Sequence, residues 1–277
     1  MKKMLSLALV LVLMMSLAAC GAKTEAPAAT TAPAAAAETT AAAAETEAAA
    51  AEVSTIEAGK LIMSTNASFP PYEMIADDGS FEGIDVEVAG AIAQKLGLEL
   101  EVDDMDFDAA LLAVQQNKSD IVMAGVTVTD DRKLVMNFTD SYATGVQVVI
   151  VKEGSDVTLD NLGEKMIGTQ RGTTGYIFTS DDYGDDHVTA YDNGASAVQA
   201  LMNGQVDCVV IDAAPAEAYV EANPGLTILD TEYVVENYAI GVNKDNTALL
   251  DAINGALAEL TADGTIDAII GKYITAE

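Results

Sequence analysis

The chain has 277 residues and carries 44 acidic against 13 basic side chains, a formal net charge of −31 at pH 7. Such an excess of negative charge argues against binding to nucleic acid and against docking on anionic lipid. With one histidine and two cysteines, a His-based catalytic triad or a zinc site of the usual kind has little to be built from. Neither a metal nor a cofactor is therefore expected.

Residues 1–19 are predicted to be a signal peptide. Lys2 and Lys3 precede an apolar run over 4–19 that is too short and wrongly flanked for a membrane span. The run leads into Leu-Ala-Ala-Cys-Gly, which resembles the lipobox of bacterial lipoproteins and implies cleavage before Cys20 and its lipidation. The alternative is an ordinary secretory signal with an incidental cysteine. A lipidated chain would be extracytoplasmic, anchored to the cell membrane by acyl chains such as palmitate rather than by a helix.

Residues 20–57 are predicted to be a linker. After the cysteine they consist almost wholly of Ala, Thr, Glu and Pro, a composition that cannot form a core. Fully extended, about 35 residues span roughly 115–125 Å. That length would hold a folded domain clear of a membrane.

From about residue 58 onward, short apolar strands alternate with helical patterns, which predicts an α/β fold with mostly parallel sheets. Strands are expected at 60–65, 98–102, 120–124 and, as a longer extended run, 143–151. Helices are expected at 85–96 and 106–116.

A second cycle repeats the same order. The expected elements are a strand at 165–169, helices from about 176 and at 195–203, strands at 206–211 and 238–242, and helices at 247–260 and 265–273. Cys208 falls in an apolar strand and has no cysteine partner once Cys20 is lipidated, so it is predicted to be a core residue. Two similar cycles predict two lobes, each with loops at the carboxyl ends of its strands, where open α/β sheets bind ligands.

One of the chain's two arginines, Arg132, follows the third expected strand within a few residues. Gly125 and Thr127, just before it, are small or hydroxylated and leave backbone amides accessible. A guanidinium beside free N–H groups and hydroxyls is suited to bind a planar anion, most simply a carboxylate. The alternative is a surface arginine paired with Asp130 or Asp131.

Seven segments, in order and at matching spacing, give the chain a specific resemblance. They are F-P-P-Y-E (69–73), G-I-D-V-E-V-A-G-A-I-A-Q-K-L-G (83–97), D-F-D-A-A-L-L-A-V-Q (106–115), T-V-T-D-D-R-K (127–133), G-T-T (172–174), N-G-Q-V-D-C-V-V-I-D (203–212) and A-D-G-T-I-D-A-I-I-G-K-Y (262–273). The chain resembles the extracellular solute-binding proteins of ABC amino-acid importers, family 3, the polar amino-acid type. The resemblance implies a two-lobed, type II periplasmic-binding-protein-like fold with two hinge strands and a ligand cleft between the lobes.

Placed on this sequence, lobe one is expected to comprise 58–144 plus 234–277, and lobe two 145–233. The hinge is expected near 144–148 and 233–237. Two crossovers would restrict the relative motion of the lobes to bending, which hinge closure requires. The implied function is a monomeric, cell-surface substrate-binding subunit that captures an L-amino acid and delivers it to an ABC permease in the membrane.

The resemblance also implies a set of ligand-binding residues: Asn66, Phe69, Phe107, Ala124, Gly125, Thr127, Arg132, Gln170, Thr173, Thr174 and Asp212. Arg132 would bind the α-carboxylate, helped by backbone N–H groups near Thr127 and at Thr174, which is close to a helix N-terminus. The ammonium group would be accepted by Asp212, the Thr127 hydroxyl and the Gly125 carbonyl.

Two of these roles have alternatives. Asp212 follows a strand directly, so it could instead cap the helix that begins at Ala213. Phe69 and Phe107 are expected to form apolar walls for the ligand, but could be ordinary core aromatics.

Side-chain selectivity is expected to depend on Asn66 and Gln170. Members of the family that bind lysine or arginine often have an acidic residue at the position of Asn66. An amide there, with Gln170 facing the side chain, predicts a polar, uncharged ligand.

Two other functions fit the same fold. A cyclohexadienyl-dehydratase-like enzyme would need an acid in the cleft, for which Glu73 is the available carboxylate. An amino-acid-sensing lipoprotein would keep the binding site but signal instead of transporting. No enzymatic activity is expected.

Overall fold

The computed structural model describes residues 53–230 and 232–274. The predicted signal peptide, the lipidation site Cys20 and the linker up to residue 52 lie outside the described residues. In the described part, no helix is both long and apolar enough to cross a membrane.

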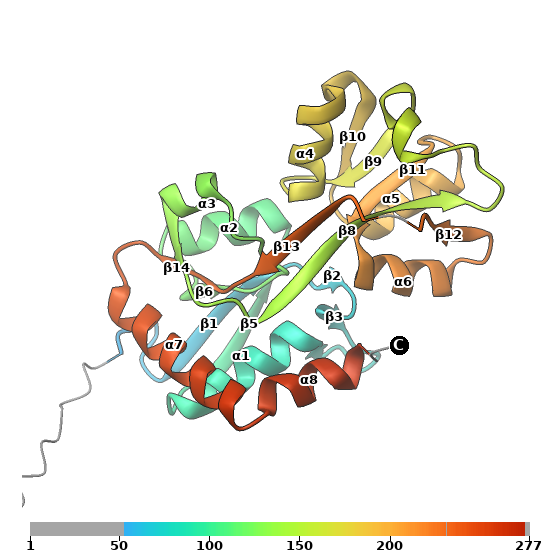
Figure 1. The fold of residues 1–277 in the computed structure, drawn as a ribbon. Helices are drawn as coiled ribbons and strands as arrows, with labels where there is room; N and C mark the ends of the chain where they lie inside the picture. Colours follow the sequence, from blue (N-terminus) through green and yellow to red (C-terminus); the bar gives the residue numbers. More distant parts are fainter. Residues whose placement is uncertain (1–52, 231, 275–277) are drawn as a thin grey trace, which may run out of the picture. The chain divides into compact units, whose positions relative to one another are not determined.

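The described chain forms two lobes, each with its own mixed β-sheet (Figure 1). The first sheet has the order β5-β1-β6-β14-β7. Strands β1 (Lys60–Thr65), β5 (Glu99–Asp104) and β6 (Ile121–Val122) are parallel. β14 (Gly241–Asn243) and β7 (Met136–Phe138) pair antiparallel to their neighbours. The sheets are thus mixed where mostly parallel ones were predicted, because the returning chain adds antiparallel strands.

Helices cover both faces of this first sheet. α1 (Ile84–Lys95), α7 (Thr247–Ala262) and α8 (Thr265–Tyr273) contact one another. α2 (Phe107–Gln115) packs separately against β1, β6 and β14, with its own apolar cluster. The short α3 (Asp130–Val135) leads into β7. Helices in proteins owe most of their stability to packing of their apolar face against such a sheet.

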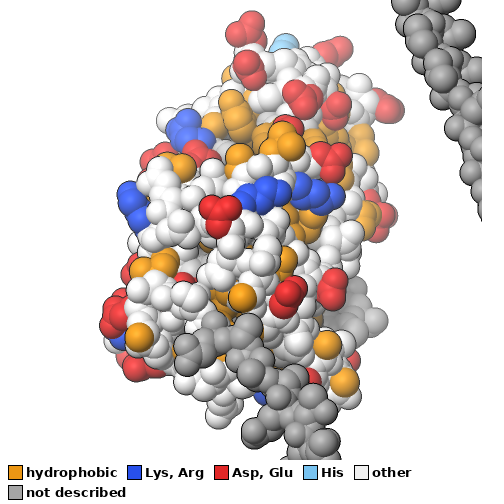
Figure 2. Space-filling model, turned by 90° about the vertical axis from the view of Figure 1, so that its left-hand side faces the viewer, with side chains coloured by type: hydrophobic (Ala, Val, Ile, Leu, Met, Phe, Trp, Pro, Cys, Tyr) orange, Lys and Arg blue, Asp and Glu red, His pale blue; other side chains and the backbone are white. Residues whose placement is uncertain are grey.

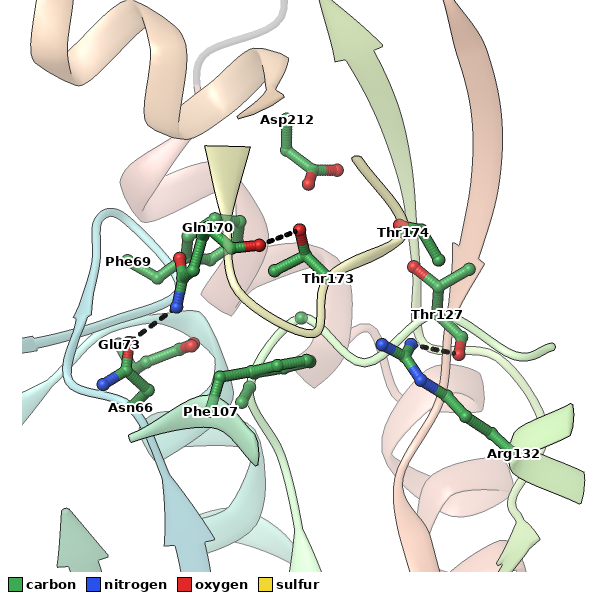
Figure 3. A pocket seen from close by; sticks show the side chains of 12 residues that line it. Asn66, Phe69, Glu73, Phe107, Thr127, Arg132, Gln170, Thr173, Thr174 and Asp212 are labelled. Carbon is green, nitrogen blue, oxygen red and sulfur yellow. Dashed lines mark hydrogen bonds between the residues drawn. The ribbon is translucent and has the colours of Figure 1, made fainter. Parts of the chain in front are cut away.

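A small antiparallel sheet lies beside the end of β1. It contains β2 (Ser68–Phe69), β3 (Glu73–Ile75) and β4 (Phe81–Glu82). None of these strands was predicted from the sequence. The hairpin turns Phe69 and Glu73 toward the space between the lobes (Figure 3).

The second sheet has the order β10-β9-β11-β8-β12. β10 (Val188–Tyr191), β9 (Ile167–Gln170) and β11 (Cys208–Asp212) are parallel. β8 (Ala143–Lys152) and β12 (Leu226–Ile228) complete it in antiparallel pairing. Cys208 is buried and free, in agreement with its prediction as a core residue.

Three helices pack on the second sheet. They are α4 (Thr174–Tyr183), α5 (Gly194–Met202) and α6 (Ala213–Ala222). Of two 3₁₀ helices in this lobe, Leu159–Glu164 lies between β8 and β9, and Asp185–His187 lies between α4 and β10. Charged side chains of both signs spread over the face drawn in Figure 2, with basic groups across its middle and acidic groups around them.

Two paired strands connect the lobes. β13 (Val234–Tyr238) runs antiparallel to the first half of β8, from Val234 opposite Gln147 to Tyr238 opposite Ala143. Figure 1 shows this pair passing from one lobe to the other. The single strand predicted over 238–242 is divided, because the chain leaves the pair at Tyr238 and starts β14 only at Gly241.

Candidate functional site

A cavity between the lobes is lined by all eleven predicted site residues together with Glu73. From the first lobe come Asn66, Phe69, Glu73, Phe107, Ala124, Gly125, Thr127 and Arg132; from the second come Gln170, Thr173, Thr174 and Asp212 (Figure 3).

Most of these residues follow the carboxyl ends of parallel strands. Asn66 follows β1, Ala124 comes shortly after β6, and Gln170 and Asp212 end β9 and β11. Because strand ends of one parallel sheet meet at one edge, residues distant in sequence gather there. Gly125 has a φ of 54°, and a Cβ at this position would lie 2.9 Å from the Phe69 ring. The loop therefore needs glycine at this position.

Arg132 is buried, with 8% of its surface exposed, which excludes the alternative of a surface arginine. Its guanidinium donates to the carbonyl of Thr127 at 2.8 Å and, across the lobes, to that of Gly172 at 3.1 Å. It also lies 5.4 Å from the centre of the Phe107 ring. In the described residues no carboxylate lies within ion-pair distance of Arg132, and Asp130 pairs with Lys133 instead.

The guanidinium keeps its charge and most of its donors. Burial lowers the pKa of Arg132 to about 10, which leaves it protonated at neutral pH. A guanidinium carries five N–H groups, and two of them are directed to the carbonyls of Thr127 and Gly172. Three N–H groups therefore remain for a planar anion.

The N-terminus of α4 faces the same cavity. Thr173 caps this helix by accepting a hydrogen bond from the backbone N–H of Tyr176 at 3.3 Å. Thr174, the first helical residue, is 3% exposed and donates through its hydroxyl to Glu236 at 2.9 Å. Unpaired backbone N–H groups at a helix start favour a negative charge nearby.

Asp212 presents a buried carboxylate to the cavity. It accepts hydrogen bonds from the Tyr238 hydroxyl and, at 2.7 Å, from Nε2 of Gln147. Although it directly precedes α6, its side chain makes no capping hydrogen bond, which argues against the helix-cap alternative. Burial raises the pKa of Asp212 to about 7. A cation bound here would favour the ionised form.

Glu73 lines the cavity, although it was not among the predicted ligand-binding residues. The sequence analysis named it only as the acid that an enzyme on this fold would need. It lies beside Asn66, at the end of the cavity away from Arg132 (Figure 3). Glu73 is 1% exposed, and neither carboxylate oxygen has a hydrogen-bond partner among the described residues. Burial and the neighbouring Asp85 raise its pKa well above the ordinary value. Its strand β3 belongs to a hairpin that the sequence reasoning did not predict.

The two amides predicted to select the side chain bond to each other. Nε2 of Gln170 donates to Oδ1 of Asn66 at 3.0 Å, across the lobes. Asn66 in turn donates to the carbonyl of Met105 at 2.9 Å. Phe69 and Phe107 line the cavity and also belong to buried apolar clusters, so both interpretations of these aromatics apply.

The chain has a two-lobed α/β fold whose lobes are joined by two strands. The cavity between the lobes is polar and is lined by one guanidinium and by buried carboxylates. This combination is typical of the class of solute-binding proteins. The sequence model of the bacterial extracellular solute-binding proteins, family 3, matches residues 61–276. The chain therefore belongs to this family. Its described residues contain no group of His, Cys, Asp and Glu side chains that could hold a metal ion.

Several relatives of the chain are named as amino-acid-binding proteins. A probable histidine-binding protein of Neisseria gonorrhoeae is 34% identical, over 78% of this chain and 83% of that protein. ABC transporter arginine-binding protein 1 of Escherichia coli (strain K12) is 31% identical, over 78% and 91%. The solved structure of an ancestral arginine-binding protein bound to glutamine is 40% identical, with a TM-score of 0.75 over 79% of this chain and 99% of that one.

Proposed function

We propose that the chain captures an L-α-amino acid in the cavity between its lobes and serves as the substrate-binding subunit of an ABC importer. The observation that carries this proposal is the placement of Arg132 and Asp212 on one cavity from different lobes. An α-amino acid offers one carboxylate and one ammonium group, and both need partners when water is displaced. The three remaining guanidinium N–H groups suit the carboxylate, and Asp212 suits the ammonium.

Binding would favour the arrangement in which the lobes approach each other. Arg132 and Thr127 come from one lobe, Thr174 and Asp212 from the other, so only the closed arrangement offers every contact. A ligand shifts the population of states by its differential affinity for them. The closed form would then be recognised by a membrane permease and release its amino acid there.

We favour a ligand with a cationic side chain. Glu73 is a buried carboxylate without a hydrogen-bond partner among the described residues, and a buried charge is costly unless a cation or donors compensate it. A guanidinium or ammonium group at that end of the cavity would supply both. The relatives named as arginine- and histidine-binding proteins support this choice.

The second candidate is the polar, uncharged ligand predicted from Asn66 and Gln170. The hydrogen-bonded amide pair supports it, because amides offer donors and acceptors to another amide. A protonated Glu73 could also donate to a neutral ligand. The structure of the ancestral arginine-binding protein bound to glutamine supports this candidate as well.

Thermal unfolding of the purified chain with single amino acids tests the proposal. A ligand at about 100 times its dissociation constant adds about 2.7 kcal/mol of stability. The panel contains L-arginine, L-lysine, L-histidine, L-glutamine and L-cystine, with L-glutamate as an anionic control. A melting temperature unchanged by every amino acid, in protein freed of carried-over ligand, would contradict the proposal.

The rival functions need separate tests. An enzyme would convert prephenate or arogenate, whereas a binding protein leaves both unchanged. An amino-acid-sensing lipoprotein would also bind the ligand. Cells that lack this protein would then take up the labelled amino acid as well as wild-type cells do.

We propose that the protein lies on the outer side of the cell membrane and is anchored there by lipid attached to Cys20. Labelled palmitate should be incorporated into the wild-type chain and not into Cys20→Ser. Sedimentation of the chain should give the mass of a monomer.

A further inference from the structure

Two buried side chains connect the candidate ammonium site to the strands that join the lobes. Gln147 lies on β8 and Glu236 on β13, with Gln147 opposite Val234 and Glu236 opposite Gly145 in the antiparallel pair. The exposed fractions of Gln147 and Glu236 are 2% and 4%. Both side chains are therefore buried, and they belong to the strand pair that passes between the lobes (Figure 1).

One amide group holds two carboxylates. Nε2 of Gln147 donates to Oδ2 of Asp212 at 2.7 Å and to Oε2 of Glu236 at 2.9 Å. The same Glu236 oxygen accepts from the Thr174 hydroxyl at 2.9 Å, and Tyr238 donates to the other oxygen of Asp212. The amide thus uses both of its N–H donors. The amide thus orients the Asp212 carboxylate directly, and it orients the Thr174 hydroxyl through Glu236.

The shared donor also brings two acidic groups close together. Like charges in a buried environment repel, and this repulsion is weakly screened. In the described residues neither Asp212 nor Glu236 forms an ion pair with a basic side chain. An ammonium group bound at Asp212 would compensate the pair, whereas a ligand without that group would leave it uncompensated. The network should therefore favour ligands that carry an α-ammonium group over ligands that lack it.

We propose that Gln147 and Glu236 are positioning residues that set selectivity for the α-ammonium group and connect occupancy of the cavity to the two strands joining the lobes. The inference rests on the proposed function, because it takes the ligand to be an α-amino acid. Neither residue is among those that line the cavity. Both act through Asp212 and Thr174.

The test compares two ligands that differ only in the α-amino group. Binding of L-arginine and of its analogue lacking that group is measured by calorimetry. Gln147→Leu keeps the approximate volume and removes the donors. It should weaken L-arginine about 10–100-fold, while affinity for the analogue changes less than about threefold. The preference for the amino acid thus shrinks.

Glu236→Gln provides a second, milder variant. It keeps an acceptor oxygen for Gln147 and Thr174 but removes one charge, so it should weaken L-arginine in the same direction with little effect on the analogue. Val235→Thr is the matched control, since Val235 is the neighbouring residue on β13 and 59% exposed. It should leave both affinities unchanged.

The outcomes separate the two proposals. Equal weakening of both ligands, or an unchanged preference in Gln147→Leu and Glu236→Gln, would overturn the positioning role while amino-acid binding by the wild type stands. If the wild-type protein prefers a ligand with an uncharged side chain, the same comparison is made with L-glutamine and its analogue without the α-amino group. A wild-type chain that binds neither amino acid would overturn the proposed function together with this role.

Discussion

The carboxylate of Asp85 accepts a hydrogen bond from the backbone N–H of Gly125 at 2.9 Å and another from the Tyr142 hydroxyl at 2.7 Å. Asp85 is fully buried in the first turn of α1. Gly125 belongs to the loop that brings Ala124 and Thr127 to the cavity, and Tyr142 directly precedes β8. A side chain outside the cavity therefore fixes both the binding loop and the entry to the connecting strands.

Replacing Asp85 by alanine should destabilise the protein. The substitution leaves two buried donors without an acceptor, and each such loss costs about 1–3 kcal/mol. The free energy of unfolding, measured in urea, should fall by about 2–6 kcal/mol. Asp85→Asn keeps an acceptor and should cost less. Glu87 lies on the same helix as Asp85 and forms a partly exposed ion pair with Lys272 of α8. Glu87→Ala is therefore the control and should cost no more than about 1 kcal/mol.

Gly145 should tolerate no larger side chain. A Cβ at this position would overlap the Tyr238 hydroxyl and the carboxylate of Asp212. Gly145→Ala should therefore displace the acceptor for the ammonium group and weaken amino-acid binding by about tenfold or more. Gly255→Ala is the control, because no atom lies within 4 Å of the added Cβ. An affinity of Gly145→Ala equal to that of the control would show that Asp212 does not need its present position.

Arg132→Ala should abolish high-affinity binding. Removing the guanidinium leaves the ligand carboxylate buried without its charged donors, a loss of about 3–5 kcal/mol, or roughly 200- to 5000-fold in the dissociation constant. The neighbouring Lys133 is exposed and pairs with Asp130, so Lys133→Ala should bind as the wild type does. Binding by Arg132→Ala within tenfold of the wild type, measured by calorimetry, would refute the assigned role.

Stability and affinity should respond to pH in opposite directions. Burial raises the pKa of Asp85 to about 6 and that of Asp212 to about 7. Between about pH 4 and 7 the folded state then binds more protons than the unfolded state, so stability of the ligand-free protein rises as pH falls. Ammonium binding needs ionised Asp212, so affinity should fall below about pH 7.

Other carboxylates do not reverse this expectation. The exposed groups Asp78, Asp156 and Asp263 have lowered pKa values because of their hydrogen bonds. Their stabilisation is lost only as pH falls below about 4, outside that range. Urea unfolding and calorimetry at pH 5, 6, 7 and 8 check both trends. Asp212→Asn should flatten the stability trend, and a wild-type stability that rises steadily from pH 5 to 8 would contradict it.

The elements that the sequence predicted well are those determined by local patterns. β1 (Lys60–Thr65) and α8 (Thr265–Tyr273) have the predicted bounds, because an apolar run and an amphipathic period are visible within a few residues. α3 spans only Asp130–Val135 and was not predicted. Six residues contain too little of a helical period to be recognised.

The cavity residues were predicted through the family resemblance and the types of residue at strand ends. Their supporting contacts could not be, since these join residues far apart in sequence. Gln147 reaches Asp212 across 65 positions, and Asp85 reaches Gly125 across 40. Glu73 was missed as a site residue because its orientation depends on a hairpin whose strands are only two or three residues long.

The charge of Glu73 should decide which side chain the cavity prefers. Glu73→Gln removes the charge and keeps a similar volume. If the ligand carries a cation, the variant should bind L-arginine about 100-fold more weakly or worse, because a buried charge loses its partner. Its affinity for L-glutamine should be unchanged or higher. Calorimetry with both amino acids measures the ratio of the two dissociation constants.

Unchanged binding of L-arginine by Glu73→Gln would instead support the uncharged ligand predicted from Asn66 and Gln170. In that case Glu73 is protonated and donates to the ligand, and Glu73→Gln, which retains an N–H donor, should bind L-glutamine within a few fold of the wild type. Glu82→Gln, on an exposed position of the same small sheet, controls for the loss of one negative charge. L-arginine bound equally well by Glu73→Gln and Glu82→Gln would exclude Glu73 as the partner of a cationic side chain.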